Sequence, residues 1–248
     1  MSTLYSATNW FNFKKWLKSP LGLLICKQET PVVKKKIGEC FGQELLLLGD
    51  TSFAAALEGS PVLHKTHVYP FKTTIDSMPT ITASFDALPF VSDSINAIYL
   101  SHCLEQVVNP QEVLHEAFRV LVPEGSIIIT GFNPWSLWGL FTALKQLFFI
   151  RTPWQSTLLS FSRLQNWLRD LSFDEIEIST HLFSLPLNNK AMLEQTAWLE
   201  YWGKIIYPLG GAWYVITARK RCFTLTPIEP ALFTIDEIVE EGLAEPSI

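Results

Sequence analysis

The polar residues best placed for chemistry follow two short apolar segments of the sequence. Ser101 and His102 come directly after residues 95–100, and Asn133 follows the segment 126–131. Both segments hold β-branched or aromatic residues, which is typical of strands buried on both faces of a parallel sheet. Because the carboxyl ends of parallel strands meet at one edge, where open α/β sheets bind ligands, we expect these side chains to share a cleft.

His102 is the residue of this group that could act as a general base near neutral pH. A structural histidine at a strand end is an equally good interpretation. Glu105, three residues later, could face the same opening, although a capping or surface role is the more common use of a loop carboxylate. The amide of Asn133 could hold a polar group of a substrate or, equally, fix the turn before Pro134.

Trp135 and Trp138 could line a substrate pocket, although packing of a helix over the core is the more common role for such residues. His64 and His67 resemble a metal pair only in number, because their spacing on a strand points them to opposite faces. The four cysteines are Cys26, Cys40, Cys103 and Cys222, and they show no paired short spacing. The sequence therefore predicts neither a metal site nor a disulfide framework, and the expected compartment is a reducing cytoplasm.

A helix is expected between the two apolar segments. Asn109 is a good N-cap, Pro110 suits the first helical position, and Glu112 lies three residues after the cap. Apolar residues then recur at helical spacing, namely Val113, Leu114, Ala117, Phe118 and Leu121. Residues 122–125 have the composition of a proline-containing turn that ends the helix. Residues 95–131 are thus predicted to form a strand, a crossover helix and a parallel strand.

The same patterns predict the other elements. Residues 44–50 are a candidate first strand ending at Gly49, and residues 53–58 could form the next helix. Residues 62–69, 173–183 and 212–219 are further strands, and an amphipathic helix at 161–171 is introduced by Ser160 or Ser162. We expect one domain over residues 1–222, with a helical extension at about 8–40 and lid-like insertions at about 134–160 and 188–207. An acidic tail at 223–248 follows.

The residues between Leu88 and Gly125 form a recognisable pattern. It consists of Leu88-Pro89-Phe90, Asp93-Ser94, His102-x-Leu104-Glu105, Asn109-Pro110 and Leu114-x-Glu116-x-x-Arg119-Val120-Leu121-x-Pro123-x-Gly125. This pattern resembles the central part of class I S-adenosylmethionine-dependent methyltransferases of the type 11 group, and residues 131–139 resemble a little-characterised bacterial branch of that group. The likeness covers roughly residues 10–221. It implies an α/β fold with a doubly wound, mostly parallel seven-stranded sheet, helical insertions and an antiparallel final strand.

The resemblance also implies where S-adenosylmethionine binds. The implied contacts are Gly49, Asp50, Ser84, Phe85, Asp86, Ser101 and His102. Gly49 and Asp50 would lie against the methionine part, and Phe85 could stack on the adenine. Three regions depart from the family pattern. The turn at Gly49 lacks the other glycines and has Leu47 in place of an acidic residue, no ribose-binding carboxylate follows residues 62–69, and Ser84 replaces an adenine-binding Asp.

The function implied by the resemblance is methyl transfer. A small or lipid-like acceptor is expected, because apolar residues between 135 and 148 would cover the strand ends. His102 would be the catalytic base only if the acceptor must lose a proton, and Asn133, Trp135 and Trp138 would line the acceptor pocket. Two alternatives stay open. One is a binding or regulatory protein that has lost catalysis, and the other is a peripheral membrane protein whose aromatic helices near residues 134–150 and 193–207 lie on lipid.

Composition agrees with a single globular domain. The chain has 248 residues, of which 48% are hydrophobic and 17% charged, and this suffices for one large core. Its net charge of -5 argues against nucleic-acid binding, and the basic run at residues 34–36 is expected on a solvated helix face. The apolar run at residues 20–25 is too short for a signal peptide, so no secretion signal is predicted.

Overall fold

The computed structural model describes residues 7–72, 78–140, 158–183, 207 and 209–221. The strands in this part of the chain are β1 (Glu44–Gly49), β2 (His64–Tyr69), β3 (Thr80–Thr82), β4 (Ile95–Ser101), β5 (Leu121–Phe132), β6 (Phe173–His181) and β7 (Trp213–Lys220). The helices are α1 (Ala7–Leu17), α2 (Pro20–Gly38), α3 (Pro110–Val120) and α5 (Phe161–Asp170), and η1 (Thr51–Leu57) is a 3-10 helix.

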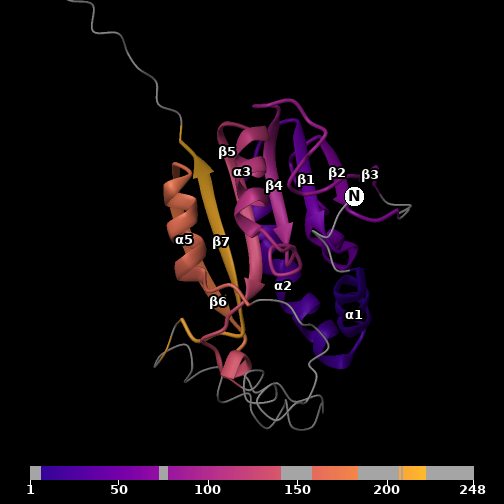
Figure 1. Cartoon of the computed structure of the whole chain (residues 1–248), viewed down its shortest axis with the longest axis vertical. Coiled ribbons are helices and arrows are strands. Elements are labelled where there is room, and N and C mark those ends of the chain that lie inside the picture. The colour runs from indigo at the N-terminus through magenta and orange to yellow at the C-terminus, as the bar shows by residue number, and fades with distance from the viewer. Residues whose placement is uncertain (1–6, 73–77, 141–157, 184–206, 208, 222–248) are drawn as a thin grey trace, which may run out of the picture.

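The seven strands form one sheet with the order β3-β2-β1-β4-β5-β7-β6. The pairs from β3 to β5 are parallel, whereas β7 runs antiparallel to both β5 and β6. Figure 1 shows β3 at one side of the sheet and β6 with β7 at the other. The predicted doubly wound, mostly parallel seven-stranded sheet is confirmed, and so is the antiparallel final strand.

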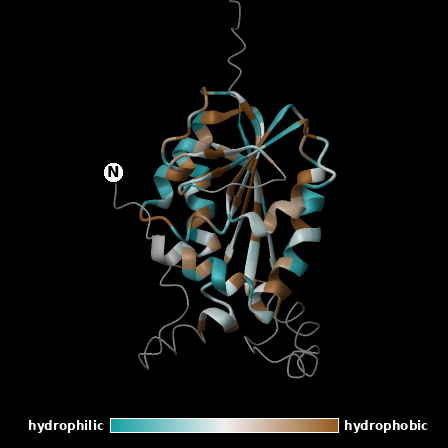
Figure 2. Ribbon diagram, turned by 90° about the vertical axis from the view of Figure 1, so that its right-hand side faces the viewer, coloured by the Kyte–Doolittle hydropathy of each residue, from teal (hydrophilic) through white to brown (hydrophobic). Residues whose placement is uncertain are grey.

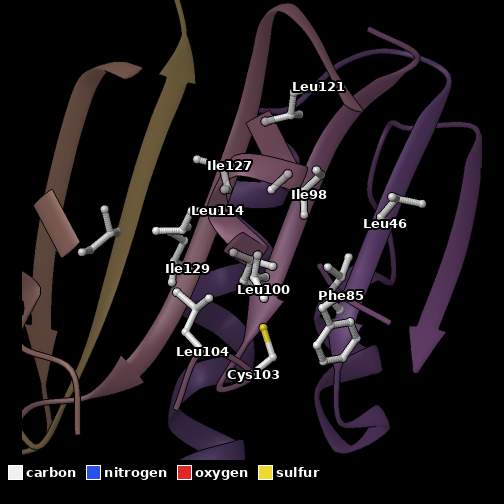
Figure 3. Packing of buried hydrophobic residues seen from close by; sticks show 14 of the residues in the cluster. Leu46, Phe85, Ile98, Leu100, Cys103, Leu104, Leu114, Leu121, Ile127 and Ile129 are labelled. Atoms are coloured by element: carbon white, nitrogen blue, oxygen red, sulfur yellow. The ribbon is translucent and has the colours of Figure 1, made fainter. Parts of the chain in front are cut away.

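Strand residues alternate between two apolar layers because successive side chains point to opposite faces. Leu46 of β1 packs in one layer with Leu114 of α3, as Figure 3 shows. Leu47, the next residue, packs in the other layer with Ile25 of α2 and Phe53 of η1. Figure 2 accordingly shows the sheet with helices on both sides. This alternation explains why β1 is apolar at every position from Leu45 to Leu48.

The connection from β1 to β2 contains a shorter helix than most parallel sheets use. Residues 53–58, predicted as a helix, lie largely within η1, a 3-10 helix of seven residues. Such a short element covers little of the sheet, and α2 supplies much of the apolar layer on this face through Ile25, Val33 and Ile37. The helix α2 thereby comes close to the carboxyl ends of the central strands.

The predicted turn at residues 122–125 lies within the bounds of β5, at an irregularity where Glu124 has a φ of +62°. α3 ends at Val120 and β5 begins at Leu121, which pairs with Ile95 of β4. The register then shifts before Ala97 pairs with Ser126, so the residues between form an irregularity within the strand. The N-cap position of α3 is Asn109 as predicted, but its side-chain oxygen accepts no backbone N–H of the helix, and its amide donates to Glu112 Oε1 at 3.0 Å.

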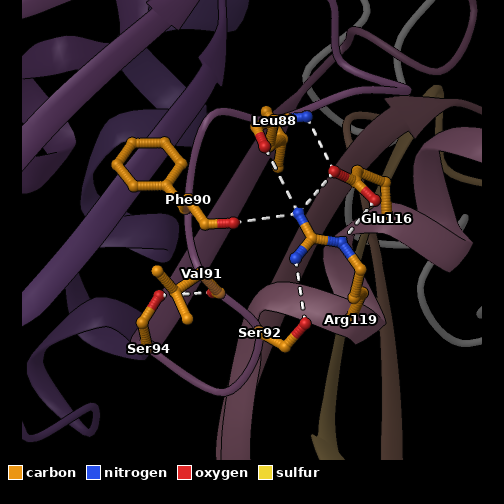
Figure 4. Close-up of polar contacts among 7 residues, drawn as sticks. All are labelled: Leu88, Phe90, Val91, Ser92, Ser94, Glu116 and Arg119. Atoms are coloured by element: carbon orange, nitrogen blue, oxygen red, sulfur yellow. Dashed lines mark hydrogen bonds and ion pairs between the residues drawn. The ribbon is translucent and has the colours of Figure 1, made fainter.

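The motif residues Leu88, Glu116 and Arg119 have a structural role that Figure 4 shows directly. The backbone N–H of Leu88 donates to Glu116 Oε1 at 2.7 Å, and the Arg119 guanidinium donates to the carbonyl oxygens of Leu88 and Phe90 at 3.3 and 3.0 Å. Arg119 also donates to Ser92 Oγ at 3.0 Å. These contacts tie α3 to the segment that leads into β4.

Some of the remaining predictions concern residues that the structure describes, and the others concern residues outside that part of the chain. Ser160, and not Ser162, caps α5, since its Oγ accepts the backbone N–H of Arg163 at 3.3 Å. Most of the predicted insertions and tail, at residues 141–157, 184–206 and 222–248, lies outside the described residues. No helix among the described residues has the length and apolarity needed to cross a bilayer.

Candidate active site at the carboxyl edge of the sheet

The carboxyl ends of β1 and β4 meet at Gly49 and Ser101, which are paired residues. Gly49 has a φ of +133°, and a Cβ there would lie 2.3 Å from the carbonyl oxygen of Ser101. His67 of β2, a buried residue, donates from Nε2 to the Gly49 carbonyl oxygen at 2.9 Å. Glycine is therefore required at position 49 by the chain's own packing, before any ligand is considered.

Asp50, predicted to contact the cofactor, is buried and caps η1. Its Oδ1 accepts the backbone N–H of Ser52 at 2.9 Å and the Ser52 hydroxyl at 2.6 Å. An Asp at an N-cap satisfies backbone donors that would otherwise lack partners. The turn after β1 is thus held by this carboxylate in place of the additional glycines of the family pattern.

The predicted adenine-binding segment is covered by α1. Phe85 is fully buried, and the indole of Trp10 meets its ring at 6.0 Å between centroids. The same indole meets the ring of Tyr69, at the end of β2, at 5.3 Å and 79°. Ser84 donates its hydroxyl to Asp86 Oδ1, and both residues are half-buried. Trp10 therefore covers part of Phe85, the residue that was expected to stack on adenine.

His102 lies between two buried carboxylates. Its Nε2 is 2.9 Å from Glu29 Oε2 of α2, and its Nδ1 is 3.8 Å from Glu105 Oε2. The other oxygen of Glu29 accepts the hydroxyl of Tyr99 at 2.7 Å. Side-chain exposure is 0% for His102, 0% for Glu29 and 1% for Glu105, so water does not screen these charges.

The two carboxylates determine the charge of His102. Burial by itself would lower the pKa of His102, but the negative charges of Glu29 and Glu105 and the hydrogen bond with Glu29 outweigh burial and raise the pKa to about 10. Burial raises the pKa of Glu105, and the neighbouring imidazolium opposes that rise. An imidazolium has no lone pair to accept a proton, so the raised pKa of His102 disfavours a role as a base at neutral pH.

Glu105 does not have the surface role that its position in a loop suggested. It is buried, and its Oε1 accepts the backbone N–H of Phe132 at the end of β5. The ring of Phe132 in turn lies 4.4 Å from the His102 ring, and Phe53 and Phe13 lie at 5.3 and 5.8 Å. Aromatic faces near a cation are favourable, and they also exclude water from the charged cluster.

Glu29 is the site residue that sequence reasoning missed. The signal was present, because α2 buries residues at every fourth position, namely Leu21, Ile25, Glu29, Val33 and Ile37. A carboxylate on such an apolar stripe needs a buried partner, since burying an unpaired charge is costly. The partners are His102 and Tyr99, about seventy positions later in the chain.

Asn133 holds the turn after β5. Its amide donates to the carbonyl oxygens of Leu209 and Gly211 at 2.7 and 3.0 Å, and its oxygen accepts the backbone N–H of Trp135 at 3.1 Å. Both sides of the amide group are thus engaged by the chain itself, which agrees with the turn-fixing alternative.

The two predicted pocket tryptophans point to different environments. Trp138 is 5% exposed and packs edge-on against Trp16 of α1, with 6.5 Å between ring centroids. Trp135, three residues earlier, is 69% exposed. The core-packing interpretation therefore holds for Trp138 but not for Trp135.

A separate cavity lies at the other end of β2. It has a volume of about 740 Å³ and is lined by residues that include Glu44, Leu57, His64, Lys65 and Met78. These residues flank the beginnings of β1 and β2, and none was predicted to bind the cofactor. Within the described ranges, no group of three or more His, Cys, Asp or Glu side chains could hold a metal ion.

Comparison with known proteins agrees with this architecture. Residues 38–129 match the family model described as a methyltransferase domain. The uncharacterized protein YafS of Escherichia coli (strain K12) is 29% identical over 215 residues, which are 85% of this chain and 82% of YafS. The ubiquinone/menaquinone biosynthesis C-methyltransferase UbiE of Roseobacter denitrificans is 36% identical over 58 residues, 23% of each chain.

Solved structures with the same fold include two further methyltransferases. One is a SAM-dependent methyltransferase of Thermotoga maritima, a possible histamine N-methyltransferase, with 15% identity and a TM-score of 0.60 over 86% of this chain and 99% of that one. The other is a SAM-dependent methyltransferase of Archaeoglobus fulgidus, with 15% identity and a TM-score of 0.58 over 79% of this chain and 94% of that one. At such identities the likeness extends to the fold.

Proposed function

We propose that this chain, which carries a methyltransferase domain of the class I fold, binds S-adenosylmethionine at the carboxyl edge of its sheet and methylates a small or lipid-like acceptor. The observation that carries the proposal is the family match, which runs from the end of α2 into β5. It includes the ends of β1, β2 and β4, where open α/β sheets bind their ligands. Fold alone would be a weak warrant for the reaction.

The residues of this edge fit the cofactor only if α1 moves. With α1 in place, Phe85 is covered by Trp10, and Asp50 is engaged in the cap of η1. An indole and an adenine are both flat bicyclic rings, so the space that Trp10 fills between Tyr69 and Phe85 suits either of them. We infer that the indole of Trp10 and the adenine compete for one position, with Ser84 and Asp86 beside it.

The bound cofactor supplies an activated methyl group, so the protein has mainly to position the acceptor and exclude water. The aromatic rings around His102 would exclude water. Two carboxylates share one imidazolium in this cluster, which leaves an excess of negative charge that would favour a cationic ligand at this edge. His102 acts here as a fixed cation that holds both carboxylates, so the acceptor has to react without giving it a proton.

The proposal is tested by calorimetric titration of the full chain with S-adenosylmethionine and S-adenosylhomocysteine. A Trp10→Ala variant should bind S-adenosylhomocysteine about tenfold more tightly, because no indole then competes with the adenine for the position between Tyr69 and Phe85. Trp167→Ala, which removes a half-buried tryptophan of α5, is the matched control and should leave the affinity unchanged.

The possible results separate the two parts of the proposal. Absence of heat from the wild type and from Trp10→Ala at millimolar ligand would contradict cofactor binding and favour a chain that has lost catalysis. Weaker binding by Trp10→Ala would contradict the competition while supporting cofactor binding. The compartment expected from cysteine usage is the cytoplasm, and cell fractionation tests it.

A further inference from the structure

The N-terminal helices carry a charge opposite to that of the whole protein. Residues 7–28 contain four lysines, Lys14, Lys15, Lys18 and Lys27, and no Asp or Glu, although the chain has a net charge of -5. The first carboxylate along the sequence, Glu29, is buried against His102 and compensates none of these lysines at the surface. The helical hairpin of α1 and the first half of α2 is therefore strongly basic.

α1 is amphipathic, with an unusual outer face. Trp10, Phe13 and Trp16 point inward and are buried. Phe11 and Lys15, four positions apart, lie on the opposite side, where Phe11 is 69% exposed. A large aromatic side chain beside lysines on a solvent-facing helix surface contributes nothing to the folded core, so it is available for a partner.

Further exposed apolar residues lie on α2 and on the segment that follows β5. Leu23 of α2 is 59% exposed and stands four positions before the exposed Lys27. Trp135, Leu137 and Leu140 are exposed in the turn and in the helical residues 137–140 that follow β5. Contact between Trp16 and Trp138 brings that segment against α1. We call the set the basic-aromatic face, and its members are Phe11, Lys15, Lys18, Leu23, Lys27, Trp135, Leu137 and Leu140.

The face lies at the ligand-binding end of the molecule. Figure 1 shows α1 at the end toward which the arrows of β1 and β4 point. Lys14 is close enough to His67, near the end of β2, for its positive charge to help lower the pKa of that histidine, chiefly lowered by burial. The basic-aromatic face therefore borders the same edge of the sheet as the candidate active site.

We propose that the basic-aromatic face binds the surface of a bilayer that contains anionic lipids. Positive charge beside exposed aromatic and leucine side chains matches a lipid interface, where lysines meet phosphate groups and the apolar side chains enter the boundary between headgroups and acyl chains. The apolar residues project from α1, from α2 and from residues 135–140 after β5, and this spread over several segments suits an extended surface such as a bilayer. The proposal is independent of methyl transfer.

Vesicle flotation of the full chain tests the proposal. The protein should float with vesicles of phosphatidylcholine mixed with phosphatidylglycerol and not with vesicles of phosphatidylcholine alone. Binding should weaken as sodium chloride is raised, because salt screens the attraction between lysines and phosphates.

Two pairs of variants locate the surface. Phe11→Ser combined with Trp135→Ser, and Lys15→Glu combined with Lys18→Glu, should each weaken vesicle binding by about tenfold or more. The matched controls lie at the other end of the molecule. Phe41→Ser combined with Leu63→Ser removes side chains that are 75% and 71% exposed, and Lys34→Glu combined with Lys35→Glu reverses two exposed charges of α2. The controls should bind vesicles as the wild type does.

Three results would overturn the proposal. The first is absence of binding to the anionic vesicles at low salt. The second is an equal loss of binding in the control variants. The third is a dimer, seen by size-exclusion chromatography with light scattering, that dissociates in the Phe11→Ser and Trp135→Ser variant, since the face would then join two copies of the chain. All variants change exposed residues, so unchanged thermal unfolding verifies that each is folded.

Discussion

At the scale of single residues, the central feature is a buried imidazolium held by two carboxylates. His102 has an ordinary position for a catalytic histidine, just past the end of β4, yet Glu29 and Glu105 raise its pKa to about 10 against the effect of burial. The residue type alone predicted a group that titrates near neutrality. The surroundings favour its charged form at neutral pH, in which it joins α2 to the sheet.

Glu29→Gln should destabilise the protein by about 1.5–3 kcal/mol, because it removes the charge-assisted hydrogen bond between Glu29 and His102 and leaves Glu105, at 3.8 Å, as the remaining carboxylate beside His102. Glu39→Gln, a change in an exposed carboxylate just after the end of the same helix, should alter stability by less than about 0.5 kcal/mol. Urea denaturation of both variants measures the difference. Similar stabilities for the two would mean that the buried cluster contributes little.

The stability that the cluster confers should depend on pH. The pKa of His102 is about 10 in the folded protein and near 6.5 when unfolded, so the contribution is complete below about pH 6.5 and is lost as pH rises toward 10. The difference in free energy of unfolding between the wild type and Glu29→Gln should therefore shrink over this range. A difference that stays constant from pH 6.5 to 10 would contradict the raised pKa.

At the scale of elements, β1 and β4 approach each other so closely at their carboxyl ends that only glycine fits at position 49. Gly49 combines a positive φ with a carbonyl oxygen of Ser101 at 2.3 Å from a hypothetical Cβ. The same residue was predicted to lie against a cofactor because of its place after the first strand. Its requirement in this chain already follows from the packing of two strands and from the hydrogen bond that His67 makes to its carbonyl.

Gly49→Ala should destabilise the protein by several kcal/mol, since both the backbone conformation and the contact with Ser101 oppose a side chain. Gly38→Ala is a matched control at the end of α2, where a Cβ would meet nothing within 4 Å. It should be neutral or stabilising by up to about 1 kcal/mol. The shift of the thermal midpoint, measured by circular dichroism, should distinguish the two variants, and equal shifts would refute this account of Gly49.

At the scale of the whole molecule, α1 lies across the carboxyl edge and joins the two apolar layers. Trp10 belongs to the layer that contains α3, and Phe13 and Trp16 belong to the layer that contains α2. A helix with contacts in both layers closes the edge where an open sheet of this kind binds ligands. The same helix presents Phe11 and Lys15 outward, so it links the proposed cofactor site with the proposed lipid surface.

Hydrogen exchange should follow the position of each strand in the sheet. β4 has hydrogen-bonded neighbours on both sides and lies in the core, whereas β3 is an edge strand of three residues. Peptides from β4 and β5 should therefore exchange slowest, and those from β3 much faster, when followed by mass spectrometry. Equal protection of β3 and β4 would contradict the observed strand order.

Much of the fold could be predicted because its signals are local. The strand before His102 and the helix after Asn109 follow from periodicity and from residues that favour helix starts. The exceptions have tertiary causes. Residues 122–125 have turn composition, but pairing of Leu121 with Ile95 extends β5 through them. The first crossover is short because α2 covers the sheet there.

The location of the candidate site could be predicted from the sequence, but the charge and the accessibility of its residues could not. The sequence by itself determined which strand-end residues reach the carboxyl edge, since the ends of strands follow from patterns over a few neighbouring positions. Only the tertiary structure decided the charge and the accessibility of these residues, because contacts of Glu29 with His102 and of Trp10 with Phe85 join segments more than seventy positions apart. Charge and access depend on such distant neighbours. Burial strengthens the fields of nearby charges, and a packed side chain excludes whatever would occupy the same space.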